Sequence, residues 1–593
     1  MSGHRQAPFP RWSALLALIL ASISSIAIVL WLAWPRMAVI DPSATVSTGQ
    51  PSFLPWTVHQ PVTRQPIVIT ATLTPLSLRT WRVIPDDELL SLTVNGQPVS
   101  LDAIPKSALT DWNKGFEMDF SPWLHGGQNT LEFVITNHGG DGGLMLHPAL
   151  GPGWMLIYLG FMPWLYTLGR IFRLRRHQIA PIGAGLMLIM AYWSVTPWTV
   201  RAHDVIGSDG HLAYIARVAE THTLPAPTET WELLQAPLYY MGGALVWKLA
   251  GIAGLPIPVC LQAYSLSLWM IFLCASSAAM RLALRFRTAA TTLATTALAM
   301  WPSGIIHGIR ISNDVGLYAV AALATLYLLK WWHRNRRRDL LIMSLFVSLG
   351  LVTKSNAIVL FAAGSLLMLL RVMRRQRWRN PDILKPYLGA WLIMCIGAAL
   401  YLGRNILYYW RGAIPDWLNG SSAIHLGEWL KVPANLTSFV KLEPITFLGS
   451  PWLVLTEDAT GRSLFWNALL RSSLTGEFQF NGSLQRSVAY LWGSMLLALM
   501  LALTWTLVRQ IRTPHPARGG WRNLPWLLLS GLWLASLMAL RFHVPYACSN
   551  DFRFVLPILV PFMVWACSRV LSAAALSLLA LGSMLFFLTL PYG

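Results

Sequence analysis

Long apolar stretches recur along most of the chain, and they limit the possible folds more than any other feature. Of the 593 residues, 55% are hydrophobic and only 12% are charged, roughly half the charged fraction of an ordinary soluble domain. Many stretches approach the roughly 20 residues that an α-helix needs to cross a bilayer. The sequence therefore predicts a polytopic α-helical membrane protein, surrounded by membrane lipids.

The basic residues gather in short loops between the apolar stretches. The formal net charge is +20, and arginines cluster at 173–176, 281–287, 334–338, 371–379 and 509–522. Such clusters mark the cytoplasmic side of a membrane and do not indicate a nucleic-acid partner. We therefore predict a multi-pass protein of the plasma (inner) membrane.

This orientation gives about 13 spans, of which the pair at 340–370 is short, as expected where helices border a water-filled cavity. The predicted spans are 12–34, 153–172, 181–200, 260–280, 289–306, 315–332, 340–353, 357–370, 386–403, 488–508, 524–540, 554–569 and 571–589. The apolar segment 238–250 is predicted to lie at the outer interface, because a crossing there would invert every later basic loop. The C-terminus is then outside.

The chain divides into three predicted parts. Residues 1–34 are an N-terminal membrane anchor helix, whose apolar run is longer than that of a signal peptide. Residues 35–152 form an inserted extracytoplasmic β-sandwich. Residues 153–593 form the transmembrane domain, with outer loops 201–259 and 404–487.

Three strands are predicted in the sandwich, at 66–73, 88–94 and 129–136, with Asn95-Gly96 as a hairpin turn. The Val-Asn-Gly end of the second strand and the motif at 119–131 resemble galactose-binding-like jelly-roll domains. That resemblance implies a fold. It leaves carbohydrate binding open against a structural or partner-docking role.

Polar residues outside the basic loops fall on the outer face. They are Asp204, Asp209, His211 and Glu232 in the first outer loop, the segment 307–314, Lys354 with its neighbours, Arg404, and the group 551–553. Charged residues at a membrane boundary are costly unless a partner, water or a substrate uses them. The outer face is therefore the predicted functional face.

Several of these motifs together resemble the GT-C glycosyltransferases, specifically the protein O-mannosyltransferase and aminoarabinose-transferase-like branch. An acidic outer loop precedes Ala236-Pro237-Leu238-Tyr239-Tyr240, a second acid follows at Asp314, and Thr353-Lys354 comes after two spans. The likeness covers roughly 181–590. It departs from the family where Gly210 follows Asp209 and where Ala236 replaces the first proline of the motif.

The resemblance implies transfer of a sugar from a polyprenyl-phosphate carrier to an unknown acceptor (protein, lipid or glycan) on the extracytoplasmic face. Such transfer needs a base for the acceptor proton. Asp209 is the predicted base, with Asp204 as its competitor. Asp314 is the second predicted catalytic acid. A helix is predicted at 211–221, directly after this loop, and helix capping is the alternative role for both Asp209 and Asp314.

The leaving phosphate needs cations. Lys354 is the strongest candidate, because it lies opposite the cationic loops, and Arg310, Arg404 and Arg553 are further candidates. The alternatives are snorkelling for Lys354 and, for the arginines, structural pairing with Asp314 or Asp551.

The predicted substrate cleft is completed by polar and aromatic residues: His211, Tyr214, Tyr239, Tyr240 and Glu477. No cofactor is required by the sequence. A divalent cation held by His203, Asp204, Asp209 and His211 is an alternative, although their spacing matches no recognised metal signature.

The competing hypothesis is a non-enzymatic transporter or assembly factor with a glycan- or partner-binding ectodomain. A transporter is expected to place ionisable residues near mid-span and to show internal repeats. Here the charges gather at one face, which favours the transferase.

Overall fold

The structure is a computed structural model that describes most of the chain between residues 12 and 590. The described residues are 12–33, 36–39, 58–59, 66–73, 79–111, 115–136, 141–149, 152–196, 210–226, 232–374, 381–410, 428–480, 482–512, 520–567 and 570–590. The chain forms two compact units. Unit 1 comprises Met1–Leu174, Trp193–Pro197 and Leu249–Ala263, and unit 2 comprises Arg175–Tyr192, Trp198–Lys248 and Tyr264–Gly593.

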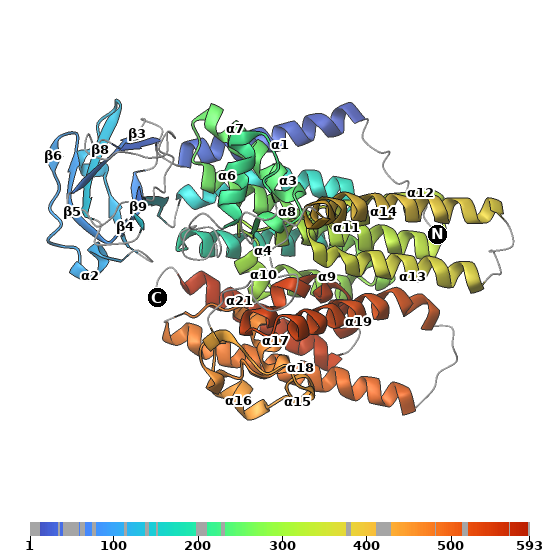
Figure 1. Cartoon of the computed structure of the whole chain (residues 1–593). Coiled ribbons are helices and arrows are strands. Elements are labelled where there is room, and N and C mark those ends of the chain that lie inside the picture. Colours follow the sequence, from blue (N-terminus) through green and yellow to red (C-terminus); the bar gives the residue numbers. More distant parts are fainter. Residues whose placement is uncertain are drawn as a thin grey trace. The chain divides into compact units, whose positions relative to one another are not determined.

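The β-structure of unit 1 forms two antiparallel sheets around one apolar core. Their strand orders are β1-β3-β8-β5-β6 and β2-β9-β4-β7 (Figure 1). The elements are β1 Arg36–Val39, β2 Val58–His59, β3 Ile67–Leu73, β4 Thr80–Asp86, β5 Glu88–Val94, β6 Gln97–Pro98, α2 Lys106–Leu109, β7 Phe116–Asp119, η1 Ser121–Trp123, β8 Asn129–Thr136 and β9 Asp141–Pro148. Alternate residues of a strand face one side, so Leu131, Phe133 and Ile135 of β8 are fully buried between the sheets.

The three strands predicted from the sequence are confirmed as β3, β5 and β8. Asn95 and Gly96 have φ values of 52° and 77°, and they connect β5 to β6 in the left-handed conformation that a tight hairpin turn requires. The Asn95 amide also donates to Asn129 Oδ1 at 2.9 Å. The jelly-roll resemblance and the boundaries at 35 and 152 stay predictions.

Two apolar helices of unit 1, α1 (Trp12–Ala33) and α3 (Pro152–Phe172), pack side by side. Gly160 permits this approach, because a Cβ at that position would lie 2.2 Å from Val29 Cγ2. The hydroxyls of Ser22 and Thr167 meet at 3.0 Å inside the same contact. The predicted anchor segment is thus a helix with a partner helix in its own unit.

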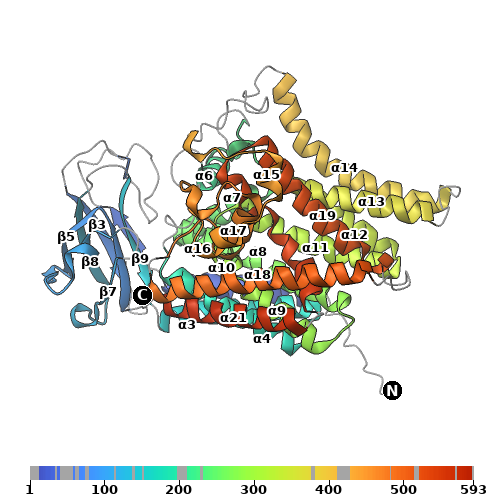
Figure 2. The same cartoon turned by 90° about the horizontal axis from the view of Figure 1, so that it is seen from below.

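Helices make up most of the described part of unit 2. They are α4 Arg176–Ser194, α6 His211–Thr221, η2 Glu232–Leu234, α7 Leu238–Ala253, α8 Ile257–Ala283, α9 Thr288–Ala299, α10 Pro302–His307, α11 Asn313–Arg334, α12 Arg337–Leu351, η3 Ser355–Ala357, α13 Ile358–Arg374, α14 Pro381–Trp410, η6 Glu428–Leu430, α15 Leu436–Val440, α16 Pro444–Gly449, η7 Asp458–Thr460, α17 Phe465–Thr475, α18 Ser483–Arg512, α19 Gly520–His543, η8 Ala547–Asn550, η9 Phe552–Ile558, α20 Leu559–Ala566 and α21 Val570–Thr589. Parts of α4, α7 and α8 belong to unit 1. The helices α18 and α21 run side by side (Figure 2).

Ten helical segments in the described part of the chain are long and apolar enough to cross a membrane. They are Ser13–Ala33, Gly153–Phe172, Ile257–Ala283, Asn313–Arg334, Ser355–Arg374, Leu384–Tyr408, Ser483–Trp505, Asn523–His543, Ala547–Ala566 and Ser572–Thr589. The chain is therefore a polytopic α-helical membrane protein, as predicted. The other three predicted spans correspond to α4, the broken pair α9–α10 and the 15-residue α12, so the count of about 13 stays a prediction.

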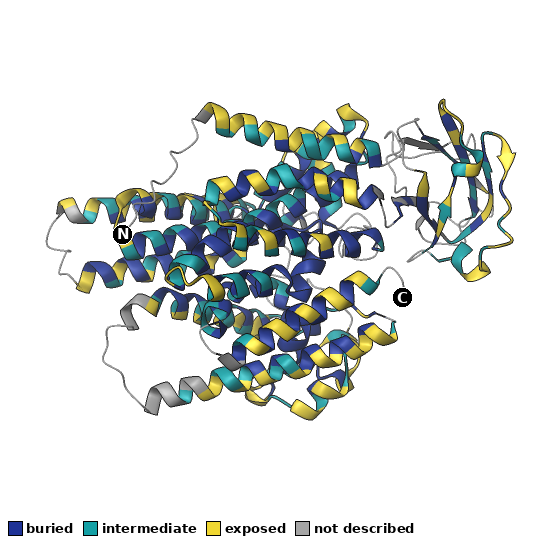
Figure 3. Cartoon of the chain, turned by 180° about the vertical axis from the view of Figure 1, so that it is seen from behind, coloured by how far each residue is buried: buried dark blue, intermediate teal, exposed yellow. Residues whose placement is uncertain are grey.

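Burial separates enclosed helices from peripheral ones. In α11, 78% of the most apolar window is buried inside the protein, whereas in α14 the share is 28%. Figure 3 shows the same contrast between dark blue and yellow helices. The beginning of α11 is therefore enclosed by protein, where a charged side chain needs a partner.

One helix is longer than the sequence predicted. The helix of the span expected to end near residue 403 continues as α14 to Trp410, so Arg404 lies within a helix. Apolar residues continue on this helix beyond Arg404, including Ile406 and Leu407, which are 48% and 51% exposed. The position of one polar residue was therefore a poor marker of the end of the helix, and the start of the outer loop at 404 stays a prediction.

Two arginines with buried side chains hold the described segment 428–480 in place. Arg541 of α19 donates to Pro433 O at 2.7 Å, and Arg462 donates to Leu455 O at 2.5 Å. Hydrogen bonds from a charged donor to backbone carbonyls fix loop conformations effectively. This segment contains α17, which ends just before Glu477.

Candidate functional site

The first turn of α11 fixes one carboxylate. Ser312 is the N-cap residue, and its hydroxyl accepts from Asp314 N at 3.2 Å and donates to Asp314 Oδ2 at 3.1 Å. Serine is a favoured N-cap because its oxygen satisfies a backbone N–H that has no partner within the helix. The alternative in which Asp314 itself caps the helix is therefore wrong, and its carboxylate is available for side-chain contacts.

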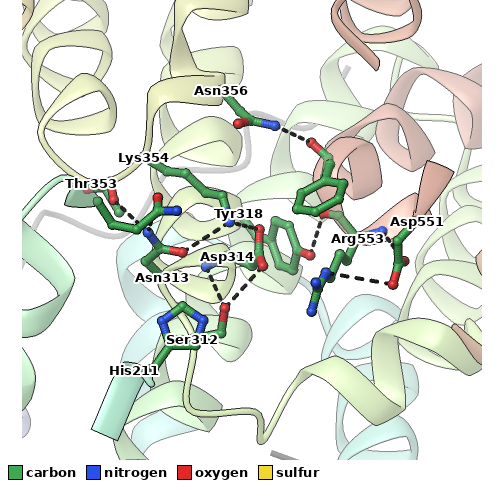
Figure 4. Close-up of polar contacts among 12 residues, drawn as sticks. His211, Ser312, Asn313, Asp314, Tyr318, Thr353, Lys354, Asn356, Asp551 and Arg553 are labelled. Atoms are coloured by element: carbon green, nitrogen blue, oxygen red, sulfur yellow. Dashed lines mark hydrogen bonds and ion pairs between the residues drawn. The ribbon is translucent and has the colours of Figure 1, made fainter. Parts of the chain in front are cut away.

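Lys354 provides the main contact to this carboxylate (Figure 4). It lies between α12 and η3, and its Nζ is 2.7 Å from Asp314 Oδ1 and 3.1 Å from Asn313 Oδ1. The lysine and aspartate side chains are only 7% and 6% exposed, so the snorkelling alternative is wrong for Lys354. We refer to Ser312, Asn313, Asp314 and Lys354 as the paired cluster.

Two hydrogen bonds bring a distant part of the chain to the paired cluster. Tyr318 of α11 donates through its hydroxyl to Arg553 O at 2.6 Å, and Asn356 of η3 donates to Phe554 O at 3.2 Å (Figure 4). The ring of Phe554 lies 5.4 Å from Lys354 Nζ. The beginning of η9 is thereby held next to the N-terminal ends of α11 and η3.

Asp551 and Arg553 form the second charged pair of the site. Asp551 caps η9, and its Oδ1 accepts from Arg553 N at 2.9 Å. Its Oδ2 lies 3.7 Å from Arg553 Nε, which is an ion-pair distance but too long for a hydrogen bond. This pair is therefore less tightly held than Asp314 and Lys354.

Arg310 has the least usual surroundings. It is 2% exposed, and none of its three guanidinium nitrogens has a hydrogen-bond partner among the described residues. Its guanidinium carbon lies 5.7 Å from the centre of the Phe478 ring. Burying a charged donor group without a partner costs several kcal/mol, roughly.

Arg310 belongs to a group of charged residues that act on one another. Burial and, to a smaller extent, the charge of Arg553 lower the pKa of Arg310, whereas Glu477 and Asp551 oppose this shift, and the resulting pKa is about 10. Burial also lowers the pKa of His307, which has the same charged neighbours. We refer to His307, Arg310, Glu477, Asp551 and Arg553 as the mixed cluster, because it combines two acids with two permanent cations.

Aromatic residues of the predicted cleft form a third group. His211 Nδ1 and Tyr240 Oη are 2.8 Å apart, and the rings of Tyr214 and Tyr240 stack with centroids separated by 3.8 Å. Burial raises the pKa of Tyr214 to about 12. The predicted helix 211–221 is confirmed as α6, and it carries both His211 and Tyr214 into this group.

Two predicted site residues have other partners. Arg404 donates to Pro225 O at 2.6 Å and to Leu233 O at 3.0 Å, so its guanidinium holds the backbone before α7. Tyr239 is 1% exposed and shares a hydrogen bond of 2.8 Å with Ser265 Oγ. Both contacts are structural, which removes the geometric support for a direct role in substrate binding.

The two acids expected to compete as catalytic base, Asp204 and Asp209, lie outside the described residues. Gly210 occupies the N-cap position of α6 without a side-chain hydrogen bond, so the interpretation of Asp209 as the N-cap residue is wrong. No group of three or more metal-ligating residues occurs in the described part of the chain. Of the alternative metal set, His203 also lies outside that part.

Sequence reasoning placed His307 and Asp551 on the outer face but did not choose them as site residues. A usable signal is present for each. His307 precedes Arg310 by three residues, and Asp551 precedes Arg553 by two, as Ser312 precedes Asp314. Such spacings place polar side chains together where a helix begins or ends.

The two clusters differ in chemical capacity. In the paired cluster, Asp314 and Lys354 neutralise each other across a short hydrogen bond. In the mixed cluster, Arg310 retains its full fork of donors, and such a fork matches a phosphate or carboxylate in bidentate geometry. An anion bound at Arg310 would satisfy the buried guanidinium, so the mixed cluster is the candidate anion site.

One family model matches a central segment of the chain. Residues 236–401 match the dolichyl-phosphate-mannose-protein mannosyltransferase family. This segment contains Arg310, Asp314 and Lys354, whereas the sandwich, Glu477 and Arg553 lie outside it. The match covers less than a third of the chain, so it shows a likeness to this family over that segment. No curated protein matches the chain.

Two solved structures are similar to the chain. ArnT from Cupriavidus metallidurans, bound to undecaprenyl phosphate, is 15% identical with a TM-score of 0.37, and the alignment covers 67% of this chain and 59% of ArnT. The arabinosyltransferase EmbB from Mycobacterium smegmatis is 14% identical with a TM-score of 0.35, covering 94% of this chain and 53% of EmbB. The chain thus spans less than two thirds of either protein.

Proposed function

We propose that the protein is an integral-membrane glycosyltransferase that moves a sugar from a polyprenyl-phosphate carrier to an acceptor on the extracytoplasmic face of the plasma membrane. The observation that carries the proposal is Arg310, a buried guanidinium without a hydrogen-bond partner among the described residues. It lies within the segment that matches a family described by its lipid-phosphate sugar donor. A phosphate is the ligand that such a group fits best.

In this proposal Arg310 and Arg553 of the mixed cluster hold the phosphate that leaves. The bond between the anomeric carbon and the phosphate oxygen breaks while the acceptor oxygen or nitrogen forms its bond to that carbon. Negative charge grows on the departing polyprenyl phosphate, and fixed cations lower the energy of that state. Arg310 supplies the main contact, and Arg553 adds a second positive charge nearby.

The paired cluster has a positioning role. Two hydrogen bonds direct Lys354 Nζ to Asp314 and Asn313, so Lys354 does not rank above Arg310 as the phosphate ligand, contrary to the order expected from sequence. The pair fixes the start of α11 against the turn before η3. Asn356 of η3 and Tyr318 of α11 then hold the backbone of η9 through their hydrogen bonds.

The acceptor proton goes to a carboxylate, for which Asp209 remains the first candidate and Asp204 the second. Asp209 comes two residues before His211, whose side chain lies near enough to Asp314 to influence it electrostatically. A base close to the acceptor and a cation at the phosphate together complete the reaction.

The test uses the full-length chain in lipid nanodiscs mixed with membranes that supply acceptors. Each member of a panel of radiolabelled polyprenyl-phosphate sugars is added, and label leaving the lipid fraction is measured. We expect one donor to be consumed, and Arg310→Lys to reduce the rate by about 100-fold or more, the typical effect of losing a preorganised oxyanion donor.

Arg336→Lys is the matched control, because Arg336 is exposed on the predicted cytoplasmic side, and we expect it to leave the rate unchanged. Consumption of no donor by folded protein would contradict the proposal and favour the transporter or assembly-factor alternative. Full activity of Arg310→Lys would remove Arg310 as the phosphate ligand.

A further inference from the structure

The mixed cluster contains more hydrogen-bonding capacity than a phosphate alone would use. Besides the three nitrogens of Arg310, His307 Nε2 and Asp551 Oδ2 are buried and have no hydrogen-bond partner among the described residues. His307 is 2% exposed and Asp551 is 4% exposed. Each such group costs about 1–3 kcal/mol when left unsatisfied, so a second polar ligand group is expected there.

The charges of the cluster indicate what this second group is. Arg310 and Arg553 carry two positive charges, and Glu477 and Asp551 carry two negative charges when ionised. Carboxylates repel a phosphate, so a pure phosphate site would not be expected to include them. They are good acceptors for hydroxyl groups, whereas cations and a histidine N–H can donate to hydroxyl oxygens.

An aromatic surface completes the group. The ring of Phe478 lies 6.4 Å from the His307 ring, centroid to centroid, and 5.7 Å from the Arg310 guanidinium carbon. Gly476 also lies beside His307, because a Cβ added to this glycine would lie 3.6 Å from His307 Nε2. Sites for small polar molecules typically combine apolar or aromatic walls with a few well-placed polar groups.

We infer that His307, Asp551 and Phe478 form the subsite for the sugar ring of the lipid-linked donor, next to the phosphate at Arg310. The ligand is a neutral, polyhydroxylated sugar, because ring hydroxyls match the donors and acceptors of the cluster without adding a further charge. His307 and Asp551 bond to ring hydroxyls, and Phe478 packs against the C–H face of the ring. This inference rests on the proposed function.

The position of these residues explains how a donor could be recognised by two modules. His307 and Arg310 precede α11 within the segment that matches the family model, whereas Phe478 and Asp551 come from the C-terminal part of the chain. The phosphate would be held mainly by the matched segment. The identity of the sugar would depend on residues outside it.

The experiment compares two lipids on the same protein. The affinity of the full-length chain in nanodiscs is measured for a polyprenyl-phosphate hexose and for polyprenyl phosphate without sugar. The variants are His307→Gln and Asp551→Asn, the second of which keeps an oxygen that can cap η9. Arg310→Lys serves as the comparison, because it acts on the phosphate shared by both lipids.

We expect His307→Gln and Asp551→Asn to weaken binding of the sugar-bearing lipid about tenfold, the effect of one or two lost hydrogen bonds, while binding of polyprenyl phosphate stays unchanged. Arg310→Lys should weaken both. Equal losses for the two lipids, or no loss for either, would overturn the sugar subsite while leaving the transferase proposal standing.

Two further outcomes are decisive. Wild-type protein that prefers a donor with an acidic or amino sugar over a neutral one would contradict the neutral-sugar assignment. Wild-type protein that binds neither lipid would contradict the proposed function itself, and the subsite would fall with it.

Discussion

The paired cluster and the mixed cluster lie close together in unit 2, but their buried charges have different surroundings. In the paired cluster, Lys354 and Asp314 meet at 2.7 Å and Ser312 completes the carboxylate's hydrogen bonds. In the mixed cluster, Arg310 is equally buried yet has no hydrogen-bond partner among the described residues. The first arrangement favours stability of the folded chain, and the second favours binding of a ligand.

This difference matters because both clusters look alike in the sequence, where each is a set of acids and bases on the outer face. A buried pair that satisfies itself is broken at a large cost when one partner is removed. When a buried cation that binds a ligand is replaced, the protein loses little stability and much function, as is common for functional sites. The two clusters should therefore respond oppositely to substitution.

The largest effect is expected at the paired cluster. Lys354→Met leaves Asp314 buried without its partner and should lower the free energy of unfolding by about 3–5 kcal/mol, seen as a lower melting temperature in nanodiscs. The double variant Lys354→Met with Asp314→Leu removes both charges and should recover most of that loss. A stable single variant would show that the pair is not the source of rigidity.

The second effect concerns function without loss of stability. Arg310→Met should reduce donor turnover by about 100-fold or more, whereas its melting temperature should not fall, because no hydrogen bond among the described residues is lost and a buried charge without a hydrogen-bond partner is removed. If Arg310→Met melts at as low a temperature as Lys354→Met, the guanidinium has a structural role, which would contradict the proposed difference between the two clusters.

Arg404 tests whether a cation with backbone partners is structural, because the sequence predicted that it binds phosphate. Its hydrogen bonds to Pro225 O and Leu233 O predict that Arg404→Gln lowers the free energy of unfolding by about 1–3 kcal/mol and leaves the affinity for polyprenyl phosphate unchanged. A loss of lipid affinity as large as that of Arg310→Lys would return Arg404 to the donor site.

The smallest effect should come from the connection between the clusters. Tyr318→Phe removes the hydrogen bond to Arg553 O and should cost about 1 kcal/mol. Because that bond positions η9, we expect a reduction of a few-fold in donor affinity, measured by titration with the lipid donor. Tyr327→Phe, on the same helix, is the control and should not alter affinity.

Local rules predicted local structure well. Strand alternation predicted β3, β5 and β8, and the Asn95-Gly96 pair predicted the hairpin turn. The helix predicted at 211–221 has the same limits as α6. Each of these depends on residues close together in the chain. The membrane character followed in the same way from runs of apolar residues.

Contacts between distant segments were not predictable in the same way. The outer position of Arg310 and Arg553 was expected, but Arg404 was an equally good candidate in the sequence, although its partners come from 169 to 179 residues earlier. It also did not distinguish Asp314 from Ser312 as the capping residue. Pairing and capping depend on side-chain geometry, which periodicity does not contain.

We propose that Arg310, and not Lys354, holds the donor phosphate. The most direct measurement is an experimental density map of the full-length chain in nanodiscs with polyprenyl phosphate bound. We predict phosphate density within hydrogen-bonding distance of the Arg310 guanidinium, with the Lys354–Asp314 pair intact. Phosphate at Lys354 with that pair broken, or phosphate away from both residues, would contradict the proposed role of Arg310.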